Sequence, residues 1–165
     1  MWPQVWQTIL EEFSDLGDVG AMTQVCVRML VAVVLGAILG YERESAGASA
    51  GLRTHMLVAL GSALFVLIPL QAGMQFDNVS RVLQGVTAGI GFLGAGAILK
   101  SENDKQITGL TTAASVWLTA AVGVAAGMGR EGTAVVSALF ALGILSLLRF
   151  KTADGDRQKS RSAPR

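Results

Sequence analysis

Residues 110–127 read LTTAASVWLTAAVGVAAG and contain no charged side chain. Four other windows resemble them in length and composition: residues 21–40, 54–70, 82–99 and 132–148. The five windows hold 90 residues but only one of the 25 formal charges, Arg28. Each window is 17–20 residues long, which at about 1.5 Å per residue spans the roughly 30 Å hydrocarbon core of a bilayer. Because a soluble helix needs a charged face, the sequence predicts an all-α membrane protein with five transmembrane helices and excludes a soluble enzyme.

The basic residues outside the windows predict how the chain is oriented. Short cytoplasmic loops of membrane proteins are enriched in Lys and Arg. The side of the membrane that carries the C-terminus has ten basic residues: Arg43, Arg53, Lys100, Lys105, Arg149, Lys151, Arg157, Lys159, Arg161 and Arg165. The opposite side has only two, Arg81 and Arg130. We therefore expect a multi-pass protein with its N-terminus outside and its C-terminus in the cytoplasm.

The chain divides into three predicted segments. Residues 1–20 place Trp2, Trp6 and Leu10 at roughly helical spacing among acidic residues, a pattern typical of an amphipathic helix on the outer membrane surface. Residues 21–149 form the five-span membrane domain. Residues 150–165 are polar and basic, so we expect a disordered cytoplasmic tail.

An internal repeat relates the first two windows to the next two. At an offset of 58, residues 35–66 match residues 93–124 at 11 of 32 positions. Both copies would cross the membrane in the same direction, which predicts two parallel-repeat hairpins followed by a fifth helix. Parallel repeats occur in transporters whose site lies between the copies. A duplicated packing module is the alternative, and the sequence leaves both open.

Glycines recur at intervals of about four residues near the end of the first window and throughout the third. They are Gly36, Gly40, Gly85, Gly89, Gly91, Gly94 and Gly96. Residues 89–94 satisfy the pattern G-x-G-x-x-G, but no soluble strand precedes them, so they do not predict a dinucleotide site. Small residues at this spacing favour close helix packing. A broken helix that lines a cavity is a second interpretation that stays open.

Ionisable residues gather where the first hairpin meets the predicted cytoplasmic surface. Glu42, Arg43 and Glu44 precede a short loop, and Arg53 and His55 follow it. Charges at a membrane boundary are costly unless they are paired or hydrated. Interfacial ion pairing explains the group without a ligand, whereas an ion or proton site would use Glu42 and His55. Two carboxylates and one imidazole suit many cations or none, so no metal is assigned.

Arg28 is the only formal charge inside a window, about two turns below the outer surface. An arginine at membrane depth needs a partner and can mark a functional site. We expect Arg28 to pair with Asp77 or Asp18, and we group Arg81 with them as an outer charge.

Hydroxyl side chains at helical spacing lie in the fourth window and just ahead of it. They are Thr108, Thr112, Ser115 and Thr119. Such hydroxyls bond carbonyls of neighbouring turns or, less often, line a pore.

Four blocks of the sequence resemble the MgtC/SapB family of bacterial inner-membrane proteins. They are GYERE (40–44), AGLRTHMLVALGSALF (50–65), GIGFLGAGAIL (89–99) and GLTTAASVW (109–117). The resemblance covers residues 22–148 and implies a five-span domain in the plasma membrane. It also implies a link to magnesium limitation and, in pathogens, to virulence. Longer members carry a cytoplasmic ACT-like domain, so the chain is expected to be a short form.

Two functions are consistent with these features. The first is a non-enzymatic regulator of ion and membrane-potential homeostasis, expected to form a homodimer in the bilayer and to contact another membrane complex, which the resemblance suggests is the F-type ATP synthase. The alternative is a small cation transporter or channel lined by Glu42, His55, Arg53 and Thr112. Neither requires nucleic acid or a cofactor, which leaves Mg²⁺ or another cation as the only ligand to consider.

Overall fold

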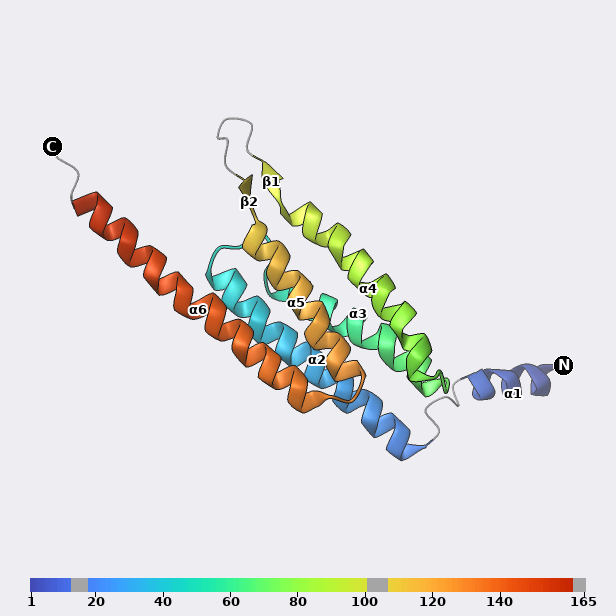
Figure 1. Ribbon diagram of the computed structural model, residues 1–165. Helices are drawn as coiled ribbons and strands as arrows, with labels where there is room; N and C mark the ends of the chain where they lie inside the picture. Colours follow the sequence, from blue (N-terminus) through green and yellow to red (C-terminus); the bar gives the residue numbers. More distant parts are fainter. Residues whose placement is uncertain (13–17, 101–106, 162–165) are drawn as a thin grey trace.

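The fold comes from a computed structural model (Figure 1). It describes residues 1–12, 18–100 and 107–161, with only the backbone described at Phe76, Leu99, Lys100 and 147–161. The helices are α1 (Trp2–Glu12), α2 (Val19–Ser45), α3 (Leu52–Gln71), α4 (Phe76–Ala97), α5 (Leu110–Gly127) and α6 (Glu131–Arg161). Two short strands, β1 (Leu99–Lys100) and β2 (Ile107–Thr108), form an antiparallel pair between α4 and α5.

The predicted windows fall on α2 to α6, so the chain is a helical multi-pass membrane protein. Among the described residues, α2, α3 and α5 are long and apolar enough to cross a membrane, and the apolar part of α6, Glu131–Ser146, is shorter. The first half of α4 carries Asp77, Arg81 and Gln84, which lower its hydropathy. The count of five spans and the orientation stay predictions.

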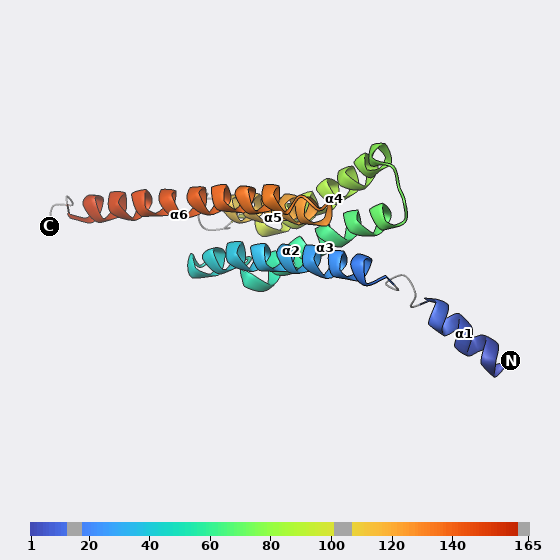
Figure 2. The same cartoon turned by 90° about the horizontal axis from the view of Figure 1, so that it is seen from below.

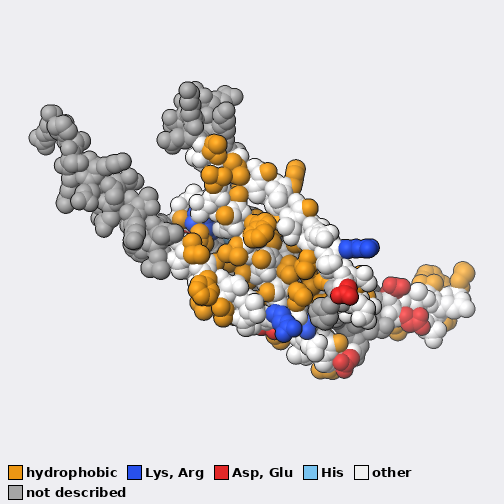
Figure 3. All heavy atoms as spheres, viewed as in Figure 1, with side chains coloured by type: hydrophobic (Ala, Val, Ile, Leu, Met, Phe, Trp, Pro, Cys, Tyr) orange, Lys and Arg blue, Asp and Glu red, His pale blue; other side chains and the backbone are white. Residues whose placement is uncertain are grey.

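The helices form two layers. Figure 2 shows α2 and α3 on one side and α5 and α6 on the other, with α1 standing apart. Helix α3 contacts both α2 and α5, and α4 packs mainly against α5. Many hydrophobic side chains lie on the surface of the bundle, as on the face drawn in Figure 3, and Phe65 is 63% exposed, Phe92 81% and Phe140 71%. An apolar exterior of this extent matches a lipid environment rather than water.

At the centre of the bundle, glycines of α2 and α5 pack directly against α3. A methyl group at Gly123 of α5 would lie 2.8 Å from the Cα of Ala59 on α3, and one at Gly127 would lie equally close to the Cα of Ala63. On α2, a methyl group at Gly36 would lie 2.9 Å from the Cβ of Ala59. Because no Cβ fits at these positions, the three helices approach at backbone distance, as small residues permit in membranes.

The hairpins share the register of the sequence repeat. Helices α3 and α5 both begin directly after a glycine, Gly51 and Gly109, which the repeat aligns. The hairpins differ at their turns: α2 runs on to Ser45, whereas α4 ends at the position aligned with Leu39 and is followed by β1 and β2. The rotation relating the hairpins stays a prediction.

Two segments differ from expectation. The β1–β2 pair was not predicted, and the window ending at residue 99 includes the first residue of β1. The tail expected to be disordered continues α6 as helix to Arg161, and residues 162–165 lie outside the described part. Residues 149–161 contain no proline and several good helix formers such as Lys, Ala, Gln and Arg, so local propensity permits the helix to continue.

Candidate functional site: a buried polar cluster at one end of the bundle

Glu42 and Arg43 lie in the last turn of α2 and are mostly buried. Their side chains are 13% and 11% exposed, and Arg43 Nη1 donates to Glu42 Oε2 at 3.3 Å. Glu42 Oε1 and Arg43 Nε are buried and have no hydrogen-bond partner within the described residues. Buried polar atoms are normally paired, so this ion pair has one acceptor and one donor available for a water, a proton or another ligand.

His55 in the first turn of α3 lies beside this pair and is fully buried. A methyl group at Gly40, two residues before Glu42, would lie 3.0 Å from His55 Cβ. The ring makes two contacts: Nδ1 is 2.9 Å from the carbonyl oxygen of Gly51, and Nε2 is 3.2 Å from Ser115 Oγ on α5. The imidazole therefore links α3 to α5 beside the end of α2.

The hydroxyl face of α5 continues the network. Ser115 Oγ donates to the carbonyl of Thr112 at 2.8 Å, and Thr119 Oγ1 donates to the carbonyl of Ser115 at 2.8 Å. All three residues are buried. Because the Ser115 and Thr119 hydroxyls bond their own helix, they do not present free donors along a pore.

The contacts of His55 allow its ring to exist in two protonation states. A carbonyl only accepts, so Nδ1 carries a proton toward Gly51. If Nε2 is also protonated, it donates to Ser115 Oγ, and the Ser115 hydroxyl continues to donate to the Thr112 carbonyl. If Nε2 is bare, the Ser115 hydroxyl can turn and donate to it. The ring can thus take up or release a proton without moving, by rotation of one hydroxyl.

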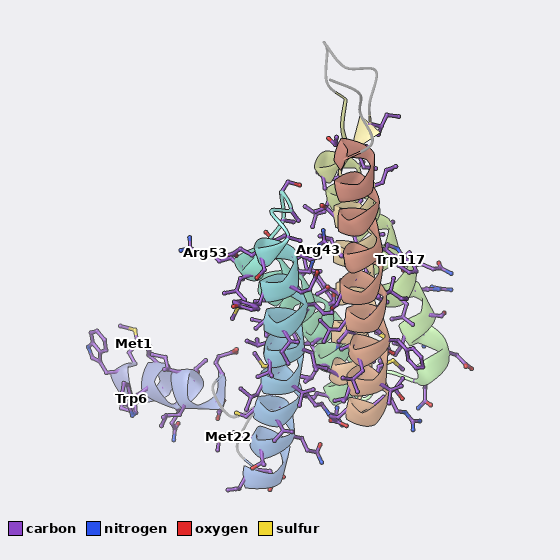
Figure 4. The ribbon with its side chains drawn as sticks, turned by 90° about the vertical axis from the view of Figure 1, so that its left-hand side faces the viewer. Met1, Trp6, Met22, Arg43, Arg53 and Trp117 are labelled. Atoms are coloured by element: carbon purple, nitrogen blue, oxygen red, sulfur yellow. The ribbon has the colours of Figure 1, made fainter. Side chains whose placement is uncertain are left out.

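Glu44 and Arg53 lie outside this cluster, although their positions in the sequence grouped them with it. Glu44 Oε2 accepts a hydrogen bond from the backbone N–H of Leu52 at 2.9 Å, which caps the start of α3. Arg53 is exposed. Figure 4 shows Arg53 pointing away from the bundle, while Arg43 points toward it. The structure therefore brings Glu42, Arg43 and His55 together at the end of α2. Ser115 connects His55 to the Thr112 carbonyl.

Ser115 is the functional contact that sequence reasoning did not assign to the cluster. It was visible only as one hydroxyl on a helical face, and its sequence separation of 60 residues from His55 gave no sign of the contact. The repeat offers a partial signal, because His55 aligns with Ala113, close to Ser115 on α5.

Arg28 bonds to a helix end rather than to the expected carboxylates. Its Nη1 donates to the carbonyl of Gly127 at 3.4 Å, at the C-terminus of α5. A methyl group at Gly129, which has φ +72°, would lie 2.6 Å from Arg28 Nη2, so this glycine makes room for the guanidinium. A cation at a helix C-terminus complements the helix dipole. Arg28 therefore lies level with the α5–α6 turn, while Asp18 caps α2 and Asp77 is exposed.

The glycines of α4 differ from those at the centre. Helix α4 is continuous from Phe76 to Ala97, so no break lines a cavity. A methyl group at Gly94 would lie 3.7 Å from Ala113 Cβ, an ordinary contact. At the other four positions a methyl group would meet no atom within 4 Å: Gly85, Gly89, Gly91 and Gly96.

No cation site can be assigned from the carboxylates and imidazole. Within the described residues, no three His, Cys, Asp or Glu side chains are placed to hold a metal ion. The cluster instead offers one carboxylate oxygen beside a guanidinium, a combination suited to a water or a proton rather than to a dehydrated divalent cation.

Comparisons with known proteins identify relatives across most of the chain. Protein SrpB of Synechococcus elongatus is 44% identical over 135 residues, covering 75% of this chain and 73% of that protein. The putative magnesium transporter YhiD of Escherichia coli K12 is 37% identical over 128 residues, covering 73% of this chain and 59% of YhiD. Protein MgtC of Salmonella typhimurium is 38% identical over 123 residues, covering 74% of this chain and 52% of MgtC.

The match thus spans only about half of the MgtC relative. No solved structure matches the chain. The MgtC family matches residues 29–153, which include α3, α4, α5 and the buried polar cluster. The chain belongs to the MgtC family.

Proposed function

We propose that the chain is a non-enzymatic plasma-membrane protein of magnesium-linked ion and membrane-potential homeostasis, and that it acts by regulating another membrane complex. Its relative YhiD is named a putative magnesium transporter, which supports the magnesium link. The F-type ATP synthase is the proposed target and a homodimer the proposed state. The choice of regulation over transport rests on the closed centre of the bundle.

The closed centre is the observation that carries the proposal. A conducting path needs a continuous polar lining across the membrane. Beyond the polar cluster at the end of α2, the fully buried residues are mostly apolar, and the buried hydroxyl of Thr119 bonds its own helix. The apolar ones include Ala32, Ala59, Val66, Val122 and Ala126. Between them, Gly123 and Gly127 meet the backbone of α3 without space for a methyl group. At these two contacts, α3 and α5 leave no space for water or an ion.

Transport of a cation is the second candidate, and one observation favours it. Glu42 Oε1 is a buried carboxylate oxygen without a partner in the described residues, and a transporter would use such an oxygen to bind its ion. This candidate requires α2, α3 and α5 to separate during transport.

ATP-driven acidification of inverted membrane vesicles tests the regulator. Vesicles from cells that produce the chain should acidify more slowly with ATP than vesicles from cells that lack it, because the synthase is restrained. Acidification driven by NADH should be unchanged, because respiration does not use the synthase. A reduction of both would indicate a proton leak and favour a channel. Equal rates with both energy sources would overturn regulation of the synthase.

A further inference from the structure

An apolar groove separates α3 from α4 over the middle of both helices. Its volume is about 520 Å³, and its walls include Leu57, Gly61 and Phe65 of α3 and Val82, Gly85 and Gly89 of α4. Ligand pockets usually measure roughly 300–1,000 Å³, so the groove is large enough for part of a lipid, such as one acyl chain. Its lining is almost entirely aliphatic, aromatic or glycine.

The glycines that line the groove make no close helix contact with the described part of the chain. A methyl group at Gly61, Gly85 or Gly89 would meet no atom within 4 Å, whereas Gly123 and Gly127 allow no methyl group at all. Glycine is unfavourable within a helix compared with alanine. Three glycines that face one empty groove therefore point to an occupant from outside the chain.

The shape of the groove suits an extended hydrocarbon chain. On α4 it runs from Val82 to Leu93, about 16 Å at the helical rise of about 1.5 Å per residue. It follows the helix axes, so in a membrane it lies along the direction of the acyl chains. An apolar groove of this length can accept one acyl chain.

A positive charge marks one end of the groove. Arg81 directly precedes Val82 and lies four and eight residues before Gly85 and Gly89, so it shares their face of α4. Side chains on a helix lean toward its N-terminus, which directs Arg81 toward the membrane surface at the α3–α4 turn. Arg81 is exposed and makes no ion pair with any described residue, including Asp77 one turn earlier.

We propose that this groove binds one anionic glycerophospholipid of the bilayer, with an acyl chain between α3 and α4 and the phosphate at Arg81. The lipid would complete the packing of α4, because α4 contacts α3 much less than α5 does. A phospholipid supplies both an acyl chain for the apolar groove and a phosphate for the adjacent Arg81, so one molecule accounts for both features.

Native mass spectrometry of the purified protein with added phosphatidylglycerol or phosphatidylethanolamine tests the site. The wild type should retain one phosphatidylglycerol, and Gly85→Leu with Gly89→Leu should lose it because leucine fills the groove. Gly143→Leu is the matched control, since a methyl group at Gly143 of α6 also meets no atom within 4 Å. Arg81→Gln should reduce the preference for phosphatidylglycerol at least threefold, whereas Arg130→Gln, also exposed, should not.

Two results would overturn the proposal. Equal retention of phosphatidylglycerol by the wild type and the folded groove variants would place the lipid elsewhere. Loss of self-association in the groove variants with unchanged lipid binding would make the groove a contact between copies. If the groove variants fail to fold, phosphatidylglycerol with a photoreactive acyl chain decides on the wild type: labelling of Leu57–Phe65 or Val82–Leu93 supports the site, and labelling only of other helices refutes it.

Discussion

Glu42 and Glu44 are two residues apart at the end of α2, and their side chains leave the helix about 200° apart. Glu42 therefore turns into the bundle, while Glu44 caps α3. Residue types and spacing predicted that a polar group forms at this end, because the short loop holds α2 and α3 together. They could not predict which residues join, because that depends on the rotation of α2 against α3, which Gly36 and Gly40 fix through their contacts.

His55→Ala should destabilise the protein by about 2–4 kcal/mol, because it removes a fully buried side chain and leaves the buried Ser115 hydroxyl without its contact to the ring. Arg53→Ala is the matched control: Arg53 is two residues away in the same helical turn but exposed, so its change should stay within about 0.5 kcal/mol. Reversible unfolding in mixed micelles measures both. Equal destabilisation by the two variants would contradict the placement of His55.

At the scale of helices, the glycines belong to two classes that the sequence did not separate. Gly123 and Gly127 bring α5 against the backbone of α3, whereas Gly85 and Gly89 face the groove. The same four-residue spacing occurs in both classes of glycine. Spacing shows only that two glycines share one face of a helix, and it does not show which element packs against that face. The extent of the helices was easier to predict, because the long uncharged windows fall on helices α2 to α6. The β1–β2 pair gave no signal, since two-residue strands have no periodicity.

Gly123→Ala should lower stability by about 1–3 kcal/mol, the usual effect of overpacking, because its methyl group would lie 2.8 Å from the Cα of Ala59. Gly143→Ala makes the same chemical change where nothing lies within 4 Å, and should leave stability unchanged or raise it slightly. Thermal unfolding of the detergent-solubilised protein compares the two. The reverse order would show that α3 and α5 do not meet at Gly123.

At the scale of the whole molecule, the separation of charged from uncharged segments predicted a helical membrane protein, and the family and the helices support it. The meeting of His55 with Ser115 and the groove beside α4 could not be predicted, because both depend on how helices far apart in sequence are arranged. Hydrophobicity does not reveal these contacts, because apolar residues occupy both the exposed surface and the buried centre of the bundle.

The excess of basic residues on one side predicts that the C-terminus is cytoplasmic. A reporter that is active only outside the cytoplasm should therefore be inactive when fused after residue 150. Activity after residue 150 would reverse the orientation and place the polar cluster on the outside.

We expect the closed bundle not to conduct cations. Mg²⁺ and proton flux into liposomes that contain the purified protein measures this directly. We predict the same flux as in protein-free liposomes, for the wild type, for Glu42→Gln and for the control Glu44→Gln, because Gly123 and Gly127 seal α5 against α3. A protein-dependent flux that Glu42→Gln abolishes and Glu44→Gln preserves would contradict the account and make the chain a transporter with Glu42 in its path.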